Sequence, residues 1–211
     1  MVHIGLTGGI AAGKSAVASR LVELGAVLID SDAIVRDLQR PGQPGLVAIA
    51  REFGPKMLAQ TGELDRQALG ELVFSDDGAR ERLNALIHPL VRQRSVETVQ
   101  RAVAERGEDV VFVHDIPLLV ETGQAGNFDK VLVVEAPRAE RIRRMVETRG
   151  MSEQDAAARI DAQATDEQRR AAADHVLVND GTEAELRSAV DEWWHRRVCA
   201  LLPDQSTESQ G

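Results

Sequence analysis

The chain has 211 residues, 43% hydrophobic and 28% charged, the composition of a globular protein with room for one sizeable core and an insertion. Its net charge of −9 argues against non-specific nucleic-acid binding, which needs basic side chains to neutralise backbone phosphates. No apolar run approaches the roughly 18 residues of a membrane helix, so we expect no membrane partner, and the single Cys199 suits a reducing cytoplasm.

Five short apolar runs alternate with helical stretches along the chain. Short runs rich in β-branched residues and separated by helices are typical of a parallel sheet with helices on both faces. The sequence therefore predicts an α/β protein with a five-stranded parallel sheet. The runs occupy residues 3–7, 26–30, 109–115, 129–135 and 175–178.

The first run leads into a glycine-rich stretch, GLTGGIAAGKS at residues 5–15, and a helical pattern follows it. This stretch matches the phosphate-loop pattern G-x-x-x-x-G-K-[ST] in the required strand–loop–helix setting. Lys14 would reach the β- and γ-phosphates of a nucleoside triphosphate, and the Ser15 hydroxyl would coordinate Mg²⁺. We therefore expect a nucleoside triphosphate and Mg²⁺ here, with the nucleotide held by Gly9, Ile10, Ala11, Ala12, Gly13, Lys14, Ser15 and Ala16.

Acidic residues follow the second and third runs, where a parallel sheet places its ligands. Asp32, in DSDAIVR at residues 30–36, has two interpretations: it accepts a proton from an attacking hydroxyl, or it or Ser31 caps the next helix. Asp115 ends the third run, where a carboxylate would lie near Mg²⁺. The sequence alone leaves the choice for Asp32 open.

Two long segments between the runs have helical periodicity. Residues 34–108 are too long for a plain connection and predict a helical insertion with its own task. Residues 137–173 are rich in arginine, which indicates either a solvated helix face or, as we favour, a lid that stabilises phosphate charge. Arg141 and Arg144 are one turn apart and can point the same way.

The remaining segments complete a nucleotide-binding core. The expected core comprises residues 1–33, 109–136 and 174–200, and the polar residues 201–211 are expected to form a disordered tail. In the last helix, at least one of Trp193 and Trp194 should pack on the sheet.

Seven segments, in this order, resemble the dephospho-CoA kinase family and cover nearly the whole chain. This resemblance implies a P-loop NTPase-type fold and transfer of the ATP γ-phosphate to the 3′-hydroxyl of dephospho-CoA, the last step of coenzyme A synthesis. The segments are GLTGGIAAGKS, DSDAIVR, GELDR, LNALIHPLV, DIPLLVE, RGMSEQDAAARIDAQ and ADHVLVNDG.

The resemblance also assigns roles to individual residues. It implies that Asp32 is the general base, that Lys14 and Arg141 or Arg144 clamp the phosphoryl group, and that residues 34–108 bind the acceptor. Asp115 would contact the acceptor and coordinate the metal ion. The remaining implied contacts are His88 and Pro89, an HP pair between helices, near the acceptor; Leu118 and Leu119 in its wall; and Asn179 and Gly181 beside adenine.

The sequence departs from the family pattern at two places. Ala11 and Ala12 stand where many members have Gly-Ser, which we expect to be tolerated if their φ angles stay negative, because only backbone N–H groups are needed there. A common lysine is replaced by Arg169 or Arg170.

Two alternative functions would require other sequence features, and the sequence does not distinguish a monomer from a homo-oligomer. A P-loop kinase for a nucleotide, shikimate or sugar would have a shorter insertion and no HP–PLLxE pairing. A nucleotide-dependent switch would need an N-K-x-D guanine motif, which the sequence lacks.

Overall fold

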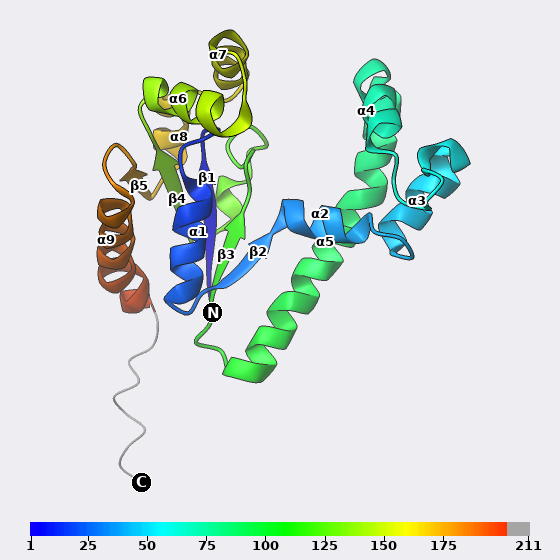
Figure 1. Ribbon diagram of the computed structural model, residues 1–211. Helices are drawn as coiled ribbons and strands as arrows, with labels where there is room; N and C mark the ends of the chain where they lie inside the picture. Colours follow the sequence, from blue (N-terminus) through cyan, green and yellow to red (C-terminus); the bar gives the residue numbers. More distant parts are fainter. Residues whose placement is uncertain (202–211) are drawn as a thin grey trace. The chain divides into compact units, whose positions relative to one another are not determined.

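The computed structural model describes residues 1–201, which fold as two compact units (Figure 1). The first unit comprises Met1–Ile29 and the described residues from Ala102 on, and the second is Asp30–Arg101. The second unit therefore includes Asp32, which the sequence-based division assigned to the core. The expected tail lies outside the described residues except for Leu201, which ends a 3-10 turn.

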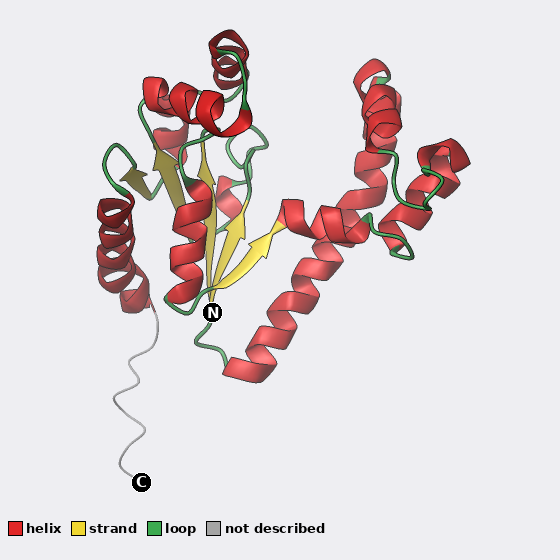
Figure 2. Cartoon of the chain, viewed as in Figure 1, coloured by secondary structure: helices red, strands yellow, loops and turns green. Residues whose placement is uncertain are grey.

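The first unit is built on a five-stranded sheet in the order β2-β3-β1-β4-β5, with parallel pairing of β1 to β3 and β4 and of β4 to β5 (Figure 2). This confirms the predicted sheet. Leu6 of β1 is in register with Asp115 of β3, so the chain leaves β1 for the glycine-rich loop close to that carboxylate. The strands are β1 Val2–Gly8, β2 Val27–Asp30, β3 Val111–Asp115, β4 Lys130–Glu135 and β5 His175–Val178.

Both faces of this sheet are covered, as the pattern of apolar runs predicts. Leu132 and Val134 of β4 pack in a cluster with residues of α1 (Lys14–Glu23) and α9 (Glu183–Trp193). The alternate residues Val131 and Val133 pack on the opposite face with Leu119, because successive strand side chains point to opposite sides. Trp193 and Trp194 are both buried in the first cluster, which confirms the expected packing. A π-helix, Trp194–Val198, and a 3-10 turn, Cys199–Leu201, follow α9.

The arginine-rich segment forms three helices of the first unit. Met145, Ala156 and Ile160 form a small apolar cluster, against which Ile10 and Ala11 of the glycine-rich loop pack. This segment therefore lies on the loop rather than apart from it. A Thr165–Gln168 capping box opens the last of the three helices. They are α6 Arg138–Arg149, α7 Glu153–Asp161 and α8 Asp166–Ala172.

The second unit is helical and has its own apolar core, which contains Leu46, Ile49 and Ile87. Apart from Asp30, the last residue of β2, its described residues form no strand, only an isolated bridge between Leu58 and Leu64. His88 and Pro89 do not lie between helices as expected, because Pro89 is inside the 30-residue α5. Proline lacks one backbone hydrogen-bond donor, but the residues on both sides of Pro89 remain helical, so α5 continues past it. The helices are α2 Ser31–Leu38, α3 Pro44–Phe53, α4 Arg66–Ser75 and α5 Asp77–Arg106, whose last turn, from Ala102, belongs to the first unit. A 3-10 turn occupies Pro55–Met57 in the second unit, and another occupies Ala125–Asn127 in the first.

Candidate active site

The glycine-rich loop joins β1, which ends at Gly8, to α1, which begins at Lys14. Gly13 caps the helix with a φ of 102°, and a Cβ atom there would overlap the Asn179 amide. A Cβ atom at Gly8 would overlap the carbonyl of Val134. The helix α1 begins with Lys14, Ser15 and Ala16, and its N-terminus, which is the positive end of the helix dipole, faces the loop. The loop therefore has the geometry of an anion-binding site.

Ala11 contradicts the expectation that the two loop alanines keep negative φ angles. Its φ is 59°, in the left-handed region that disfavours a residue with a Cβ atom by roughly 1–2 kcal/mol. The side chain packs against the Met145 cluster, and the carbonyl oxygen accepts a hydrogen bond from Arg144. These contacts hold the residue in a conformation that glycine would adopt without strain.

Ile10 is anchored to the arginine-rich segment through its backbone. Its amide N–H donates to Oε1 of Gln163 at 2.8 Å, and its side chain joins the apolar cluster below α6 and α7. The N–H of Ile10 is therefore committed to Gln163 and does not point into the cradle, unlike the inward orientation expected for the loop amides.

Lys14 and Asp115 form an ion pair at the end of the sheet, with side chains only 18% and 13% exposed. Mg²⁺ takes one or two carboxylates and completes its octahedron with phosphate oxygens and water, so Asp115 is a suitable ligand. Ser15, the residue after Lys14 in α1, carries a hydroxyl group. No group of three or more His, Cys, Asp or Glu side chains gathers within residues 1–201, so these residues offer no all-protein metal cage.

Two buried arginines, Arg141 of α6 and Arg169 of α8, face Gly9. Their side chains are 4% and 2% exposed. A Cβ atom at Gly9 would overlap Nη1 of Arg141 and lie 3.5 Å from Nη1 of Arg169. Both guanidinium groups donate to Asp166, at 3.1 Å each. Arg141 lies where the lid interpretation requires a cation, whereas Arg169 entered the sequence analysis only as a departure from the family pattern.

The structure separates the roles of the two adjacent arginines in α8. Arg169 points inward, and Arg170 instead donates to Oε2 of Glu135 at 2.7 Å. An i, i+1 pair cannot face the same way on a helix, and this spacing was the available signal that only one of the two belongs to the loop.

Arg144 and Asn179 hold the middle of the loop. Arg144 Nη1 donates to the carbonyls of Ala11 and Ala12 at 3.2 and 3.4 Å, and its Nε donates to Glu140 at 3.0 Å. The buried Asn179 donates from Nδ2 to Ala12 at 2.8 Å. Asn179 was expected beside adenine. In this structure its side chain is hydrogen-bonded to the loop backbone. Gly181 lies two residues later at the surface, where a Cβ atom would overlap the Glu185 carboxylate.

Asp32 lies in the first turn of α2 in the second unit and is exposed. The residue that caps α2 is Asp30, whose Oδ1 accepts from the Ala33 amide at 2.8 Å. The capping interpretation left open for Asp32 and Ser31 is therefore wrong. Within the described part of the chain, the Asp32 carboxylate has no hydrogen-bond or ion-pair partner.

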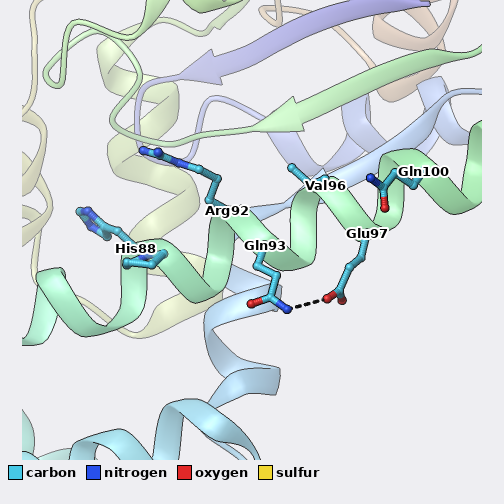
Figure 3. Close-up of a pocket in the computed structure, with 7 residues that line it drawn as sticks. His88, Arg92, Gln93, Val96, Glu97 and Gln100 are labelled. Atoms are coloured by element: carbon cyan, nitrogen blue, oxygen red, sulfur yellow. Dashed lines mark hydrogen bonds between the residues drawn. The ribbon is translucent and has the colours of Figure 1, made fainter.

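The second unit has a groove of about 560 Å³ along one side of α5 (Figure 3). His88 and Arg92 project from the same side of the helix, one turn apart, beside the apolar surface of Pro89 and Val96. The guanidinium of Arg92 has no partner among the described residues. No sequence motif indicated Arg92, although its i+4 spacing from His88 places it on the same face of the helix.

Only one of the two leucines expected in an acceptor wall is accessible. Leu118 is 49% exposed, whereas Leu119 is fully buried with Val131 and Val133. Leu119 therefore belongs to the core of the sheet and cannot line an open wall, because its side chain lies under Gly5 of β1.

Comparison with known proteins gives one consistent result. The sequence model of the dephospho-CoA kinase family matches residues 2–185. A dephospho-CoA kinase of Streptomyces avermitilis is 50% identical over 99% of this chain and 100% of its own length. One of Mycolicibacterium paratuberculosis is 49% identical over 98% of this chain, which spans only 50% of that longer relative.

Solved structures agree with the sequence relatives. A dephospho-CoA kinase from Campylobacter jejuni is 27% identical, with a TM-score of 0.69 over 95% of this chain and 98% of that one. The protein TT1252 from Thermus thermophilus is 35% identical, with a TM-score of 0.78 over 96% and 98% of the two chains. In the described residues of the present chain, no helix is long and apolar enough to cross a membrane.

Proposed function

The chain belongs to the dephospho-CoA kinase family, and we propose that it transfers the γ-phosphate of ATP to the 3′-hydroxyl of dephospho-CoA, giving coenzyme A and ADP. The observation that carries this proposal is the family match over residues 2–185, together with a relative of that name that is 50% identical over the full length of both chains. The phosphate loop between β1 and α1 supplies the donor site that the reaction needs.

ATP would lie with its phosphates along residues 9–16 and its γ-phosphate toward Gly9, which the guanidinium groups of Arg141 and Arg169 approach. Lys14 would exchange Asp115 for the β- and γ-phosphates, and Arg141 and Arg144 would stabilise negative charge on the transferred oxygens. Asn179 and Gly181 would lie beside the adenine of ATP. Ser15 and Asp115 are the residues that would hold Mg²⁺, which neutralises phosphate charge when bound.

Asp32 would act as the general base. Its carboxylate would take the proton as the 3′-oxygen attacks the γ-phosphorus, and the bond from that phosphorus to the bridging oxygen would break, leaving ADP. The exposed and unpartnered state of Asp32 supports this role, since the carboxylate would not have to give up another contact.

The acceptor would be held chiefly by the helical unit. A dephospho-CoA molecule offers a diphosphate and a long pantetheine arm, and the α5 groove offers the Arg92 guanidinium and the His88 imidazole beside the apolar Pro89. Asp115 and the exposed Leu118 would complete the acceptor contacts. A cytoplasmic location remains the expectation, on the ground of the single cysteine.

The proposal is tested by measuring ADP release from Mg²⁺-ATP with dephospho-CoA, shikimate, gluconate or a nucleoside monophosphate as acceptor. We expect turnover with dephospho-CoA alone, a product heavier by one phosphoryl group, and none of this turnover in the Lys14→Ala variant. Turnover with another acceptor, or ADP release that does not require any acceptor, would refute the assignment.

A further inference from the structure

Asp166, the first residue of α8, lies between the two buried arginines that face Gly9. Its Oδ2 accepts a hydrogen bond from Nη2 of Arg141, and its Oδ1 accepts one from Nη1 of Arg169, each at 3.1 Å. It is the single carboxylate among the described residues with a hydrogen bond to both guanidinium groups. One side chain thus connects α6 and α8 at the phosphate end of the loop.

We propose that Asp166 is a positioning residue, which fixes Arg141 and Arg169 so that their remaining N–H groups face the phosphoryl group in transfer. This inference rests on the proposed kinase function. Asp166 itself would act through the two arginines, because an anionic carboxylate attracts their guanidinium groups and repels phosphate oxygens.

The electrostatic reason lies in the burial of the two cations. Removing two like charges from water is costly, and they repel each other unless an anion lies between them. Burial lowers the pKa of Arg141, which Arg169 lowers further, and the Asp166 carboxylate opposes both effects. Without Asp166, the two guanidinium groups would separate or turn toward solvent.

The unused donors of the arginines indicate what they face. Nε of Arg141 and Nε of Arg169 are buried and have no hydrogen-bond partner within residues 1–201, and the buried Nη2 of Arg169 has only an ion-pair contact with Glu121, at 3.6 Å. Buried polar groups are usually hydrogen-bonded, and a set of free guanidinium donors is best satisfied by an anion with several oxygen atoms. A γ-phosphate at Gly9 would provide such an anion.

Other carboxylates nearby cannot replace Asp166. Glu121 lies 3.6 Å from Nη2 of Arg169 and makes no hydrogen bond or ion pair with Arg141 among the described residues, and Glu135 is ion-paired with Arg170. The start of α8 does not depend on the Asp166 side chain either, because the Thr165–Gln168 capping box satisfies it. A neutral side chain at position 166 should therefore leave the fold intact.

The test compares Asp166→Asn with Asp161→Asn. Asp161 is a matched control, because its carboxylate also binds an arginine of α6, Arg138, at 2.6 Å, but on the exposed surface. Asparagine at 166 accepts from one guanidinium and turns an N–H group toward the other. For each protein we would measure kcat, KM for both substrates, the ATP dissociation constant by calorimetry, and Tm.

For Asp166→Asn we expect kcat to fall roughly 10- to 100-fold, the cost of a misplaced catalytic group, with KM for dephospho-CoA within twofold and Tm nearly unchanged. Asp161→Asn should keep the kcat of the unmodified protein, and Asp166→Glu should recover part of the loss. A kcat within twofold in Asp166→Asn, or an equal loss in both asparagine variants, would overturn the proposal. So would a loss of Tm without a loss of kcat per folded molecule, the signature of a merely structural role.

The same measurements separate this inference from the proposed function. If the unmodified protein does not phosphorylate dephospho-CoA, the proposed function fails, and the role of Asp166 is then decided by ATP affinity alone. A fivefold or greater weakening of ATP binding in Asp166→Asn, absent in Asp161→Asn, would still support it. Equal ATP dissociation constants in the two variants would refute it.

Discussion

Replacing Asp32 by asparagine tests the chemistry of the helical unit with the least disturbance of its structure. The substitution keeps the size of the side chain and removes its ability to take a proton. If Asp32 is the general base, kcat should fall by roughly 10²- to 10⁴-fold, which is the usual contribution of general base catalysis. KM for ATP should stay the same, because Asp32 would bind the acceptor and not the nucleotide.

The structure sets the expected effect of this substitution on stability close to zero. Asp32 is exposed and makes no hydrogen bond or ion pair with the described residues, since the amide of Ala33 donates to Asp30. Loss of the Asp30 cap in Asp30→Ala should instead cost about 1 kcal/mol. For a chain of 211 residues this corresponds to a fall in Tm of about 2–4 °C.

The assay combines ADP release under saturating substrates with thermal unfolding of Asp32→Asn, Asp30→Ala and Asp37→Asn. Asp37→Asn is the control for losing a carboxylate of α2, since Asp37 only pairs with Arg40 at 3.3 Å and Arg94 at 3.8 Å. Its kcat should stay within twofold of the unmodified protein. Unchanged turnover in Asp32→Asn, or a fall in its Tm as large as that of Asp30→Ala, would refute the reasoning.

Three further predictions concern the nucleotide-binding unit. Ala11→Gly should remove roughly 1–2 kcal/mol of left-handed strain from the folded state, and the entropy that glycine adds to the unfolded chain should offset about 0.4–1 kcal/mol of this gain. Chemical denaturation should therefore give a free energy of unfolding equal to or slightly higher than that of the unmodified protein. A clearly lower value would contradict the strain at Ala11. Arg144→Ala should lower kcat more than it raises KM for ATP, and an effect on KM alone would exclude a role in the transfer step. Burial, and then the nearby His3, lower the pKa of His114 to about 4, so between pH 6.5 and 4 the unfolded chain binds the extra proton and stability falls as pH falls. His114→Asn should flatten that part of a plot of Tm against pH, and an unchanged slope would show that other groups cause it.

Local patterns were sufficient wherever neighbouring residues determine the structure. The β-branched runs predicted the five strands, because a strand buried on both faces needs a continuous apolar segment. The glycines of the loop indicated a phosphate cradle, because close backbone approach excludes side chains at Gly8 and Gly13. The arginine-rich segment predicted cations over that loop, and Arg141 and Arg144 lie there.

The errors occurred where a residue's environment comes from distant parts of the chain. Periodicity could not show that α5 continues through Pro89, since the flanking helical residues decide that outcome. The sequence does not distinguish the adjacent Leu118 and Leu119. Leu119 is buried because it packs against β4, a contact that the sequence pattern does not show. The negative φ expected for Ala11 failed because contacts with α6 and α7 hold the loop in another conformation.

The sequence by itself determined the fold class, the phosphate loop and the resemblance to the dephospho-CoA kinases, because these depend on short patterns and their order along the chain. Only the tertiary structure decided that Asp30 rather than Asp32 caps α2, that Arg169 rather than Arg170 turns inward, and that Asp166 joins two arginines. Each of these depends on the direction in which a side chain leaves its helix and on the charge that it meets there, and neither is encoded in the spacing of residues alone.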